Sequence, residues 1–561
     1  MIEKIIKYSA NNPFLIILLT LLGIAWGIYS LKNIPLDAIP DLSDPQVIVF
    51  TEWKGRAPDL IEDQITYPIV SSMVAAPKVT SARGYSMFGL SFVYLLFEEG
   101  TDLYWARSRT LEYLSKIKNE LPDDVNPVLG PDASGVGWIL TYSLVDESGK
   151  NSIEDLRSFQ DWKLRYLIES VPGVAEVASV GGYVIQYQIQ VNPNALAQYG
   201  ITIDEIMKKV RNSNRDVGGR ILEMSEREYF IRGLGYLKSI EDIKNISLKT
   251  TKNGEPILIK NVANVAKVPE IRRGAVDLNG KGEAASAIVV MRYGGDALKI
   301  AKQVKEVLNQ IQGSLPQGAH IEITYDRTKV IQGSIDTLKV KLIEEVLIVA
   351  LIILLFLWHF RSSLVPILTL PIAIIFAFIP MYYFGVSSNI MSLAGIAIAI
   401  GAMVDAAIIM IENAHKALET WHSSGEKQSR KELLIKACQE VGRPIFFSLL
   451  VIAVSFMPIF ALQGQEGRLF KPLAFTKNFS MFFAALLAIT LVPLLIVKLL
   501  RIPKKINISP RWLNQFINFI WAGKPRAEDK HPISKVLFKI YHPVLDFVLK
   551  HRVKALIVSA L

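Results

Sequence analysis

IMSLAGIAIAIGAMVDAAIIMI, residues Ile390 to Ile411, has the length of a helix that crosses a bilayer, and Asp405 is its only charged residue. Lipid offers a carboxylate neither water nor a counter-charge, so a residue of this kind usually faces a polar interior and moves ions or protons. Helix packing alone does not require a charge at that depth. The stretch therefore predicts a helical membrane bundle with a transport function.

A second carboxylate, Glu412, follows Asp405 by seven residues. On a helix this spacing places both on nearly the same face, with Glu412 about 10.5 Å nearer the cytoplasm. Two interpretations stay open. Glu412 could pass a proton onward, or it could mark the end of the helix in a wet interface.

The composition indicates a chain that is partly membrane and partly soluble. Of its 561 residues 51% are hydrophobic, too many for an ordinary soluble enzyme, and 20% are charged, too many for a chain that lies wholly in lipid. The single cysteine, Cys438, excludes an intramolecular disulfide framework and CxxC-type metal sites. Phosphate-loop, dinucleotide and hydrolytic nucleophile motifs are absent from the sequence. We therefore expect neither an enzyme nor a resident cofactor.

The net charge of +10 is concentrated near the end of the sequence. Between Arg501 and Lys554 there are twelve basic residues and three acidic ones. Basic residues beside hydrophobic spans hold a loop in the cytoplasm by charge. We interpret the cluster in this way, and we do not expect a nucleic-acid partner.

Hydrophobic runs predict the membrane topology. The run Phe14 to Leu31 lacks a cleavage site after it and reads as an uncleaved first span. Further spans are expected at 338–358, 364–385, 390–411, 444–462 and 475–500, and a seventh begins near Val553. With the N-terminus inside, residues 32–336 lie outside and the basic loops lie inside. Aromatic residues around Trp512 and Phe516 favour either a helix lying flat in the interface or a short soluble helix packed on the bundle.

The exported region contains an internal repeat. Val79 to Tyr85 matches Val177 to Tyr183, 98 residues later, and each copy has the pattern helix, strand, strand, helix. Alternating stretches with the turn Asn253-Gly254 predict a smaller β-rich lobe. The expected domains are the first span at 1–32, a first subdomain at 33–135, a second at 136–185 and 270–332, the lobe at 186–269, five spans within 335–500, a basic cytoplasmic linker at 501–552, and the start of a seventh span at 553–561.

Several longer stretches carry a family resemblance. They are PLDAIPDLSDPQV (35–47), FEEGTDLYWARSR (97–109), GPDASGVGW (130–138), VPGVAEVASVGG (171–182), GAMVDAAIIMIENAHK (401–416) and GQEGRLFKPLAFTK (464–477). With one span, a large exported α+β region and five more spans, the chain resembles the N-terminal half of a resistance-nodulation-division (RND) efflux permease. Within the heavy-metal branch it looks like the copper and silver exporters of the Cus type rather than the zinc, cobalt and cadmium exporters of the Czc type.

The resemblance implies a fold and roles for particular residues. The fold is a membrane α-helical bundle of six spans plus the start of a seventh, with a periplasmic α+β region of repeated βαβ-type sandwich subdomains and a small β-rich docking lobe. Asp405 matches the position that exchanges protons, and Met391, Met403 and Met481 match a stepwise thioether relay for the metal. Single methionines are also ordinary gap-fillers in apolar helices. Arg83 matches a basic residue near the periplasmic substrate cleft, although a salt-bridged surface arginine is the simpler interpretation.

The resemblance also implies an assembly. It predicts a proton/metal antiporter in the bacterial inner membrane, a homotrimer that works with a periplasmic adaptor and an outer-membrane channel. Because the family has twelve spans, the sequence is expected to be a fragment or one half of a split pump, with the basic partner of Asp405 and the main metal site in the missing C-terminal half. Two alternatives are an exporter of divalent cations or organic compounds, and an inactive truncated subunit that acts only by assembly.

Overall fold

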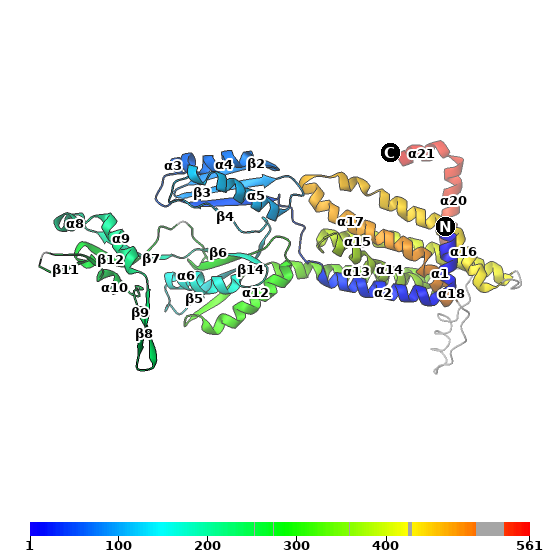
Figure 1. Ribbon diagram of the computed structural model, residues 1–561. Helices are drawn as coiled ribbons and strands as arrows, with labels where there is room; N and C mark the ends of the chain where they lie inside the picture. The colour runs from blue at the N-terminus through cyan, green and yellow to red at the C-terminus, as the bar shows by residue number, and fades with distance from the viewer. Residues whose placement is uncertain (252, 273, 358–359, 424–428, 501–531, 561) are drawn as a thin grey trace. The chain divides into compact units, whose positions relative to one another are not determined.

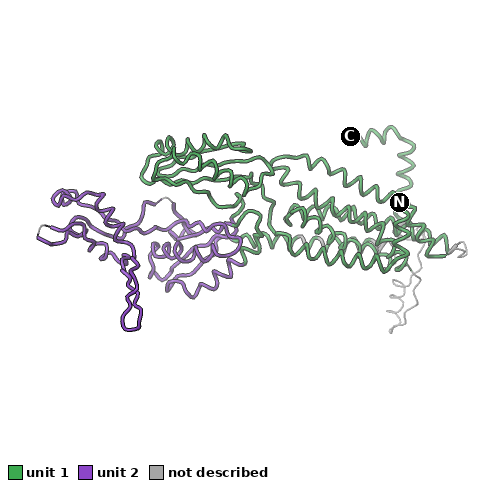
Figure 2. Tube along the Cα trace, viewed as in Figure 1, with its two compact units in different colours: residues 1–137, 291–302, 326–561 green, residues 138–290, 303–325 purple. Residues whose placement is uncertain are grey.

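The protein is described here by a computed structural model, which covers residues 1–251, 253–272, 274–357, 360–423, 429–500 and 532–560. Its chain divides into two compact units (Figure 2). Unit 1 contains residues 1–137, 291–302 and 326–561, and unit 2 contains residues 138–290 and 303–325. The long apolar helices therefore belong to the same unit as the first sheet of the region that the sequence predicts to be exported, which we call the first exported sheet.

Unit 1 contains the long apolar helices (Figure 1). They are α2 (Pro13–Asn33), α13 (Arg327–Leu357), α14 (Phe360–Tyr383), α15 (Ile390–Ser423), α16 (Arg430–Val454) and α17 (Gly464–Ile489), with the shorter α1 (Ile2–Asn11) and α18 (Leu491–Leu499). Within the described ranges, five segments are long and apolar enough to cross a membrane: 13–33, 361–383, 390–421, 430–461 and 464–489. Helix α13 covers the additional span expected at 338–358, and the total number of spans stays a prediction.

Several helices extend well beyond the hydrophobic runs that predicted them. Helix α16 begins at Arg430, whereas the apolar run begins at 444, and α15 continues to Ser423, whereas the run ends at Ile411. Hydropathy marks only the part of a helix that lies in hydrocarbon, and the polar ends of these helices continue into water. As a consequence, Glu412 lies inside α15 and does not mark its end.

The bundle is centred on the pair α15 and α17, which make the most extensive helix–helix contact in the described structure. Gly395 of α15 lies against Leu473 and Thr476 of α17, where an added Cβ would be only 2.4 Å from the carbonyl oxygen of Leu473 and 2.2 Å from Oγ1 of Thr476. Small residues permit such close approach between membrane helices. Because α16 returns the chain between them, α15 and α17 run in the same direction.

Aromatic residues gather at one end of α2 and α14. Trp26 packs edge-on against Tyr383, with ring centroids 6.0 Å apart, and Tyr29 packs edge-on against Tyr382 at 6.1 Å. Tyrosine and tryptophan favour the boundary between lipid and water. We therefore expect this end of the bundle to lie at the membrane interface, beside the segment that leads into the first exported sheet.

The first exported sheet has four strands in the order β2-β3-β1-β4. Its strands are β1 (Gln46–Glu52), β2 (Val79–Met87), β3 (Leu90–Phe97) and β4 (Val128–Leu129). Buried residues alternate along β1 and β3, so one face of the sheet packs in an apolar core with helices α3 (Pro58–Ile61), α4 (Tyr67–Val74) and α5 (Leu103–Lys116).

Unit 2 contains a second four-stranded sheet, in the order β14-β5-β13-β6. Its strands are β5 (Trp138–Asp146), β6 (Val174–Val180), β13 (Ala285–Met291) and β14 (Ala319–Asp326). Written from its other edge, the order is β6-β13-β5-β14. It corresponds strand by strand to the order β2-β3-β1-β4 of the first sheet, with β13 in the position of β3. The π-helical turns at Glu62 and Gln160, which are also 98 residues apart, repeat as well.

The second copy of the repeat departs from the sequence expectation at its second strand. This strand, β7 (Ile185–Val191), leaves the sheet and pairs with β12 (Ala263–Pro269) in the small lobe. The lobe is inserted between β6 and β13, so the strand that completes the sheet comes later in the sequence. A short sequence match could not anticipate that the insertion splits the hairpin.

The lobe has its own apolar core and one protruding hairpin. It contains the pairs β7/β12, β10/β11 (Ser247–Thr250, Pro256–Leu258) and β8/β9 (Val217–Met224, Arg227–Gly233), with helices α8 (Pro193–Tyr199), α9 (Ile203–Ser213), α10 (Ile240–Lys244) and α11 (Ile259–Val262). Helix α12 (Ala297–Ile311) follows β13. Every residue of β8 and β9 is exposed.

The last described segments are α20 (Pro532–Lys550) and α21 (Arg552–Ala560). The interfacial helix expected around Trp512, and most of the basic linker, lie outside the described residues.

Candidate functional site

Asp405 lies on α15 among four buried neighbours and is itself exposed. The adjacent Met403, Val404, Ala406 and Ala407 are all less than 7% exposed. No hydrogen bond or ion pair joins Asp405 to another residue in the described ranges. The carboxylate is therefore directed away from the core of the helices described here.

Asp405 belongs to a continuous stripe on α15. The exposed stripe consists of Ile398, Gly401, Asp405 and Ile409, which are separated by three or four residues and so share one helix face. Leaving a carboxylate on this face in contact with lipid would cost about 2.5–3.5 kcal/mol on insertion scales. Because of this cost, we expect the stripe to face other protein and not lipid.

Glu412 has a partner, unlike Asp405. Its Oε1 accepts a bond from Nζ of Lys416 one turn further along α15, at 2.6 Å, and both side chains are about half exposed. Nearby, Ser362 Oγ and His415 Nε2 are 2.6 Å apart and join the start of α14 to α15. The predicted partner of Asp405 in proton transfer thus sits in an exposed ion pair.

The three predicted metal-relay methionines are all in the bundle. Met403 and Met481 are 4% and 1% exposed and belong to the same apolar cluster, whereas Met391 in the first turn of α15 is half-buried. Met403 follows Gly395 by eight residues, and Met481 follows Leu473 by eight. Since Gly395 touches Leu473 and the helices run in the same direction, both sulfur-bearing residues lie about 12 Å beyond that contact, at a common depth.

A small cavity of about 10 Å³ adjoins Met403. Its lining comes from α14, α15, α17 and α18 and is dominated by small residues: Thr369, Leu370, Ala373, Met403, Ala406, Ala407, Ala484, Leu487, Ala488 and Val492. A cavity of this size holds about one water-sized group. It lies on the face of α15 opposite the exposed stripe.

Lys477 is a buried charged residue of α17 that the sequence did not single out. It is 2% exposed inside α17; its Nζ donates to the carbonyl oxygen of Ile452 at 3.2 Å and lies 3.0 Å from the ring centroid of Phe456. The ammonium group thereby contacts the C-terminal end of α16, where cations are favourable. A lysine within the apolar run AFTKNFSMFF was the available signal.

Arg83 lies on the open face of the first exported sheet. It lines a cavity of about 360 Å³ together with Gln46, Tyr85, Met87, Phe92, Tyr94 and Leu96. Its side chain is exposed and forms no ion pair with any described residue. The described residues therefore do not include the salt-bridge partner that the simpler interpretation expected. A basic group and aromatic rings in one cavity could hold an anionic or polar ligand, and the role in a substrate cleft stays a prediction.

The acidic segment after α2 is used for structure. Arg327 Nη2 lies 2.8 Å from Oδ1 of Asp37, and Arg327 also donates to the carbonyl of Val136. Burial raises the pKa of Asp37 above its usual value, and the neighbouring Arg327 opposes that rise. Among the residues described, no group of three or more histidine, cysteine, aspartate or glutamate side chains is placed to hold a metal ion.

Comparisons with known proteins agree with these features. A sequence model of the AcrB/AcrD/AcrF family matches residues 5–561. SilA of Salmonella typhimurium, a putative cation efflux system protein, is 49% identical over 100% of this chain and 52% of its own length. The cation efflux system protein CusA of Escherichia coli (strain K12) is 47% identical with the same coverage. CzcA of Alcaligenes sp. (strain CT14), also a cation efflux system protein, is 34% identical over 91% of this chain and 49% of its own length.

A solved structure of a heavy metal efflux pump superposes with a TM-score of 0.76 at 29% identity, covering 87% of this chain and 48% of that one. The chain spans about half the length of the curated relatives it matches. The chain belongs to the AcrB/AcrD/AcrF family, and its resemblance to the heavy-metal branch of RND efflux permeases, with the Cus type foremost, is confirmed.

Proposed function

We propose that this chain forms the proton-coupling part of an inner-membrane RND permease that exports Cu(I) or Ag(I) at the expense of the proton gradient. One observation carries the proposal. Asp405 and Met403 lie two residues apart on α15, with Met481 of α17 at the depth of Met403. A titratable group on the exposed stripe of α15 thus lies at nearly the same depth as two buried thioethers.

The role of Asp405 follows from its position on an exposed face of α15, which other protein must cover inside the membrane. A carboxylate there is neutral when protonated and charged when not, so each protonation changes how strongly the stripe is attracted to a basic or polar partner. One proton moving through about 100 mV releases roughly 2.3 kcal/mol, whereas a tenfold metal gradient costs roughly 1.4 kcal/mol. One proton per ion is therefore sufficient for a tenfold gradient.

The methionines favour soft monovalent ions as cargo. Thioether sulfur binds Cu(I) and Ag(I), whereas Zn(II) prefers imidazole, thiolate and carboxylate ligands. The relatives with the higher identities, SilA and CusA, are named as cation efflux proteins, but so is CzcA, so the identity of the metal rests on the methionines.

Two exposed surfaces support an assembly. The exposed stripe of α15 requires cover by other helices of the pump, which would also supply the basic partner of Asp405. The β8/β9 hairpin is exposed along its whole length, and an isolated two-stranded ribbon is marginally stable in water. We propose that a second copy of the chain covers this hairpin in a homotrimer; the periplasmic adaptor and outer-membrane channel are carried over from the family resemblance.

The cargo is tested by replacing Met391, Met403 and Met481 together with leucine in the pump expressed from its native gene. Leucine conserves volume, and such exchanges usually cost less than about 1.5 kcal/mol each, so the protein should still insert. We expect silver tolerance to fall to that of cells without the pump. Met457→Leu is the control, since Met457 is exposed and has no matched position in the relay. Unchanged silver tolerance in the triple variant would rule out the copper and silver assignment.

A further inference from the structure

The stretch GQEGRLFK at the start of α17 has a structure that the transport proposal does not use. Gly464 opens the helix at φ +62°, a conformation that favours glycine. A Cβ on Gly467 would lie 2.5 Å from the carbonyl oxygen of Leu462, so the chain turns tightly into the helix. Gly464, Arg468 and Lys471 are separated by four and three residues and share one face. We call this segment, Gly464 to Lys471, the α17 cap.

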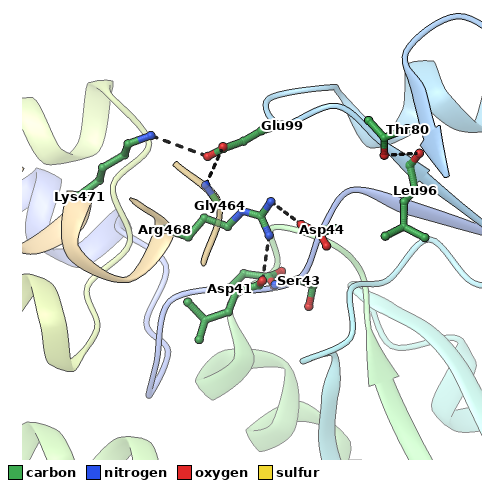
Figure 3. A network of polar contacts seen from close by, with 10 residues as sticks. Asp41, Ser43, Asp44, Thr80, Leu96, Glu99, Gly464, Arg468 and Lys471 are labelled. Atoms are coloured by element: carbon green, nitrogen blue, oxygen red, sulfur yellow. Dashed lines mark hydrogen bonds and ion pairs between the residues drawn. The ribbon is translucent and has the colours of Figure 1, made fainter. Parts of the chain in front are cut away.

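Arg468 connects the cap to the segment that leads into β1. Its Nη1 donates to the carbonyl oxygen of Leu42 at 2.8 Å, and its Nη2 lies 2.7 Å from Oδ1 of Asp44 (Figure 3). The carbonyl of Leu42 is held in place because Asp41 Oδ1 accepts a bond from the amide of Ser43 at 2.9 Å. The Arg468 side chain is only 15% exposed, so water screens these bonds weakly.

Glu99 connects the cap to the turn that follows β3, at the same end of the sheet as the start of β1. Its Oε2 accepts from the amide of Gly464 at 3.1 Å, and its Oε1 lies 3.7 Å from Nζ of Lys471 (Figure 3). Glu99 sits in the tight turn after β3, where Thr101 N donates to the carbonyl of Glu98 at 3.1 Å. An anionic side chain at the first turn of α17 is also favoured by the helix dipole.

The cap therefore contacts the segment just before β1 and the turn just after β3 through bonds with defined direction. Just beyond the cap, Leu473 of α17 is in close contact with Gly395 of α15, and Thr476 of α17 packs at the same point. Helix α15 carries Asp405 ten residues further along. A displacement of α15 must therefore carry α17 with it, because packed helices of this kind are not compressible.

We infer that Arg468, Lys471 and Glu99 are coupling residues, which transmit a movement of the Asp405 helix to the first exported sheet. They act as positioning residues, because none of them contacts the proton-exchanging carboxylate or the relay methionines. The inference rests on the proposed function in one respect, namely that the charge state of Asp405 drives the movement. Two regions far apart in the sequence thus form one mechanical connection between the membrane and the exported region.

Hydrogen exchange on the natural protein in nanodiscs tests this connection. Asp405→Asn, which fixes the neutral state, is compared with the wild type. With the cap intact, we expect the amides of residues 98–101 to change their exchange rate by about fivefold or more, a common size for coupling between sites. With Arg468→Ala and Lys471→Ala combined, that change should fall below roughly twofold, while the change in α15 and α17 remains.

Glu99→Gln breaks the same connection from the exported side and must give the same result, which keeps the test valid if the double variant folds poorly. Lys116→Ala is the control, because Lys116 pairs with Glu112 at 3.5 Å on α5 of the same subdomain and has no contact with the cap. A change at residues 98–101 that persists in both cap variants would overturn the inference, as would the absence of any change in the wild-type background. Metal export by Asp405→Asn, measured separately, tests the proposed function without reference to the cap.

Discussion

Gly395 of α15 and Leu473 of α17 are in direct backbone contact: a Cβ added to Gly395 would lie 2.4 Å from the Leu473 carbonyl oxygen. This contact sets the relative height of the two helices and so brings Met403 and Met481 to one level. It also means that α17 follows any displacement of α15. Both the proposed metal path and the proposed coupling depend on it.

Gly395→Val should therefore separate α15 from α17. The clash is with backbone, which cannot rotate away, and overpacking of this kind costs about 1–3 kcal/mol. We expect a lower unfolding temperature in detergent and a loss of silver tolerance. Gly333→Ala on α13 is the control, because no atom lies within 4 Å of its added Cβ. Wild-type stability and tolerance in Gly395→Val would show that the contact is dispensable.

The ion pair between Asp37 and Arg327 holds the chain where α2 ends and α13 begins. Their side chains are 15% and 6% exposed, and removing one partner of a buried pair costs about 3–5 kcal/mol. Arg327→Ala should destabilise the protein by an amount of this order. Lys339→Ala, on the same helix but in an exposed pair with Asp336, should change stability by less than about 1 kcal/mol.

The loss in Arg327→Ala should depend on pH. Burial already raises the pKa of Asp37, and removing Arg327 takes away the charge that opposes the rise. A raised pKa in the folded state penalises the ionised form, so the destabilisation is full above the folded pKa and shrinks as the pH falls through it towards the unfolded value of 3.8. Unfolding temperatures measured at about pH 7 and about pH 4.5 should show a smaller deficit at the acidic pH. An equal or larger deficit there would contradict this electrostatic account.

Lys477 should tolerate replacement by an apolar residue. Lys477→Met loses one hydrogen bond to the Ile452 carbonyl but also removes a buried charge, so the free energy of unfolding should change by no more than about 1 kcal/mol. Lys477→Glu places a negative charge at the C-terminal end of α16 and should lower the yield of folded protein much further. Failure of Lys477→Met to fold would show that the ammonium group is structurally essential.

Local patterns in the sequence were sufficient to predict the apolar parts of the long helices. The apolar run with a single Asp405 predicted the middle of α15, and the match at Val79 and Val177 predicted two related sheets. Hydropathy could not find the polar extensions of α15 and α16, because those parts lie outside hydrocarbon. The sequence showed Lys477 only as the last residue of a stretch that carries the family resemblance. Its burial could not be predicted, because burial depends on neighbours that come from other helices.

Contacts between segments that are distant in the sequence could not be predicted, because they depend on how the whole chain folds. Arg468 and Asp44 are separated by more than 400 residues, and nothing in either stretch specifies the other. Arg327 and Asp37 are 290 residues apart, and neither stretch specifies the other. Only the fold identifies which cations pair with the aspartates of the acidic segment after α2.

Metal export by Asp405→Asn is the measurement that tests the central claim most directly. The natural protein and the variant would be reconstituted in vesicles with an imposed proton gradient, and silver transport and the accompanying proton flux would be recorded together. Asparagine keeps the size of the side chain but cannot exchange a proton, whereas Asp405→Glu retains the carboxylate as a control. The account predicts that Asp405→Asn inserts normally and transports neither silver nor protons, while Asp405→Glu retains part of both. Silver export by Asp405→Asn at the wild-type rate would contradict it.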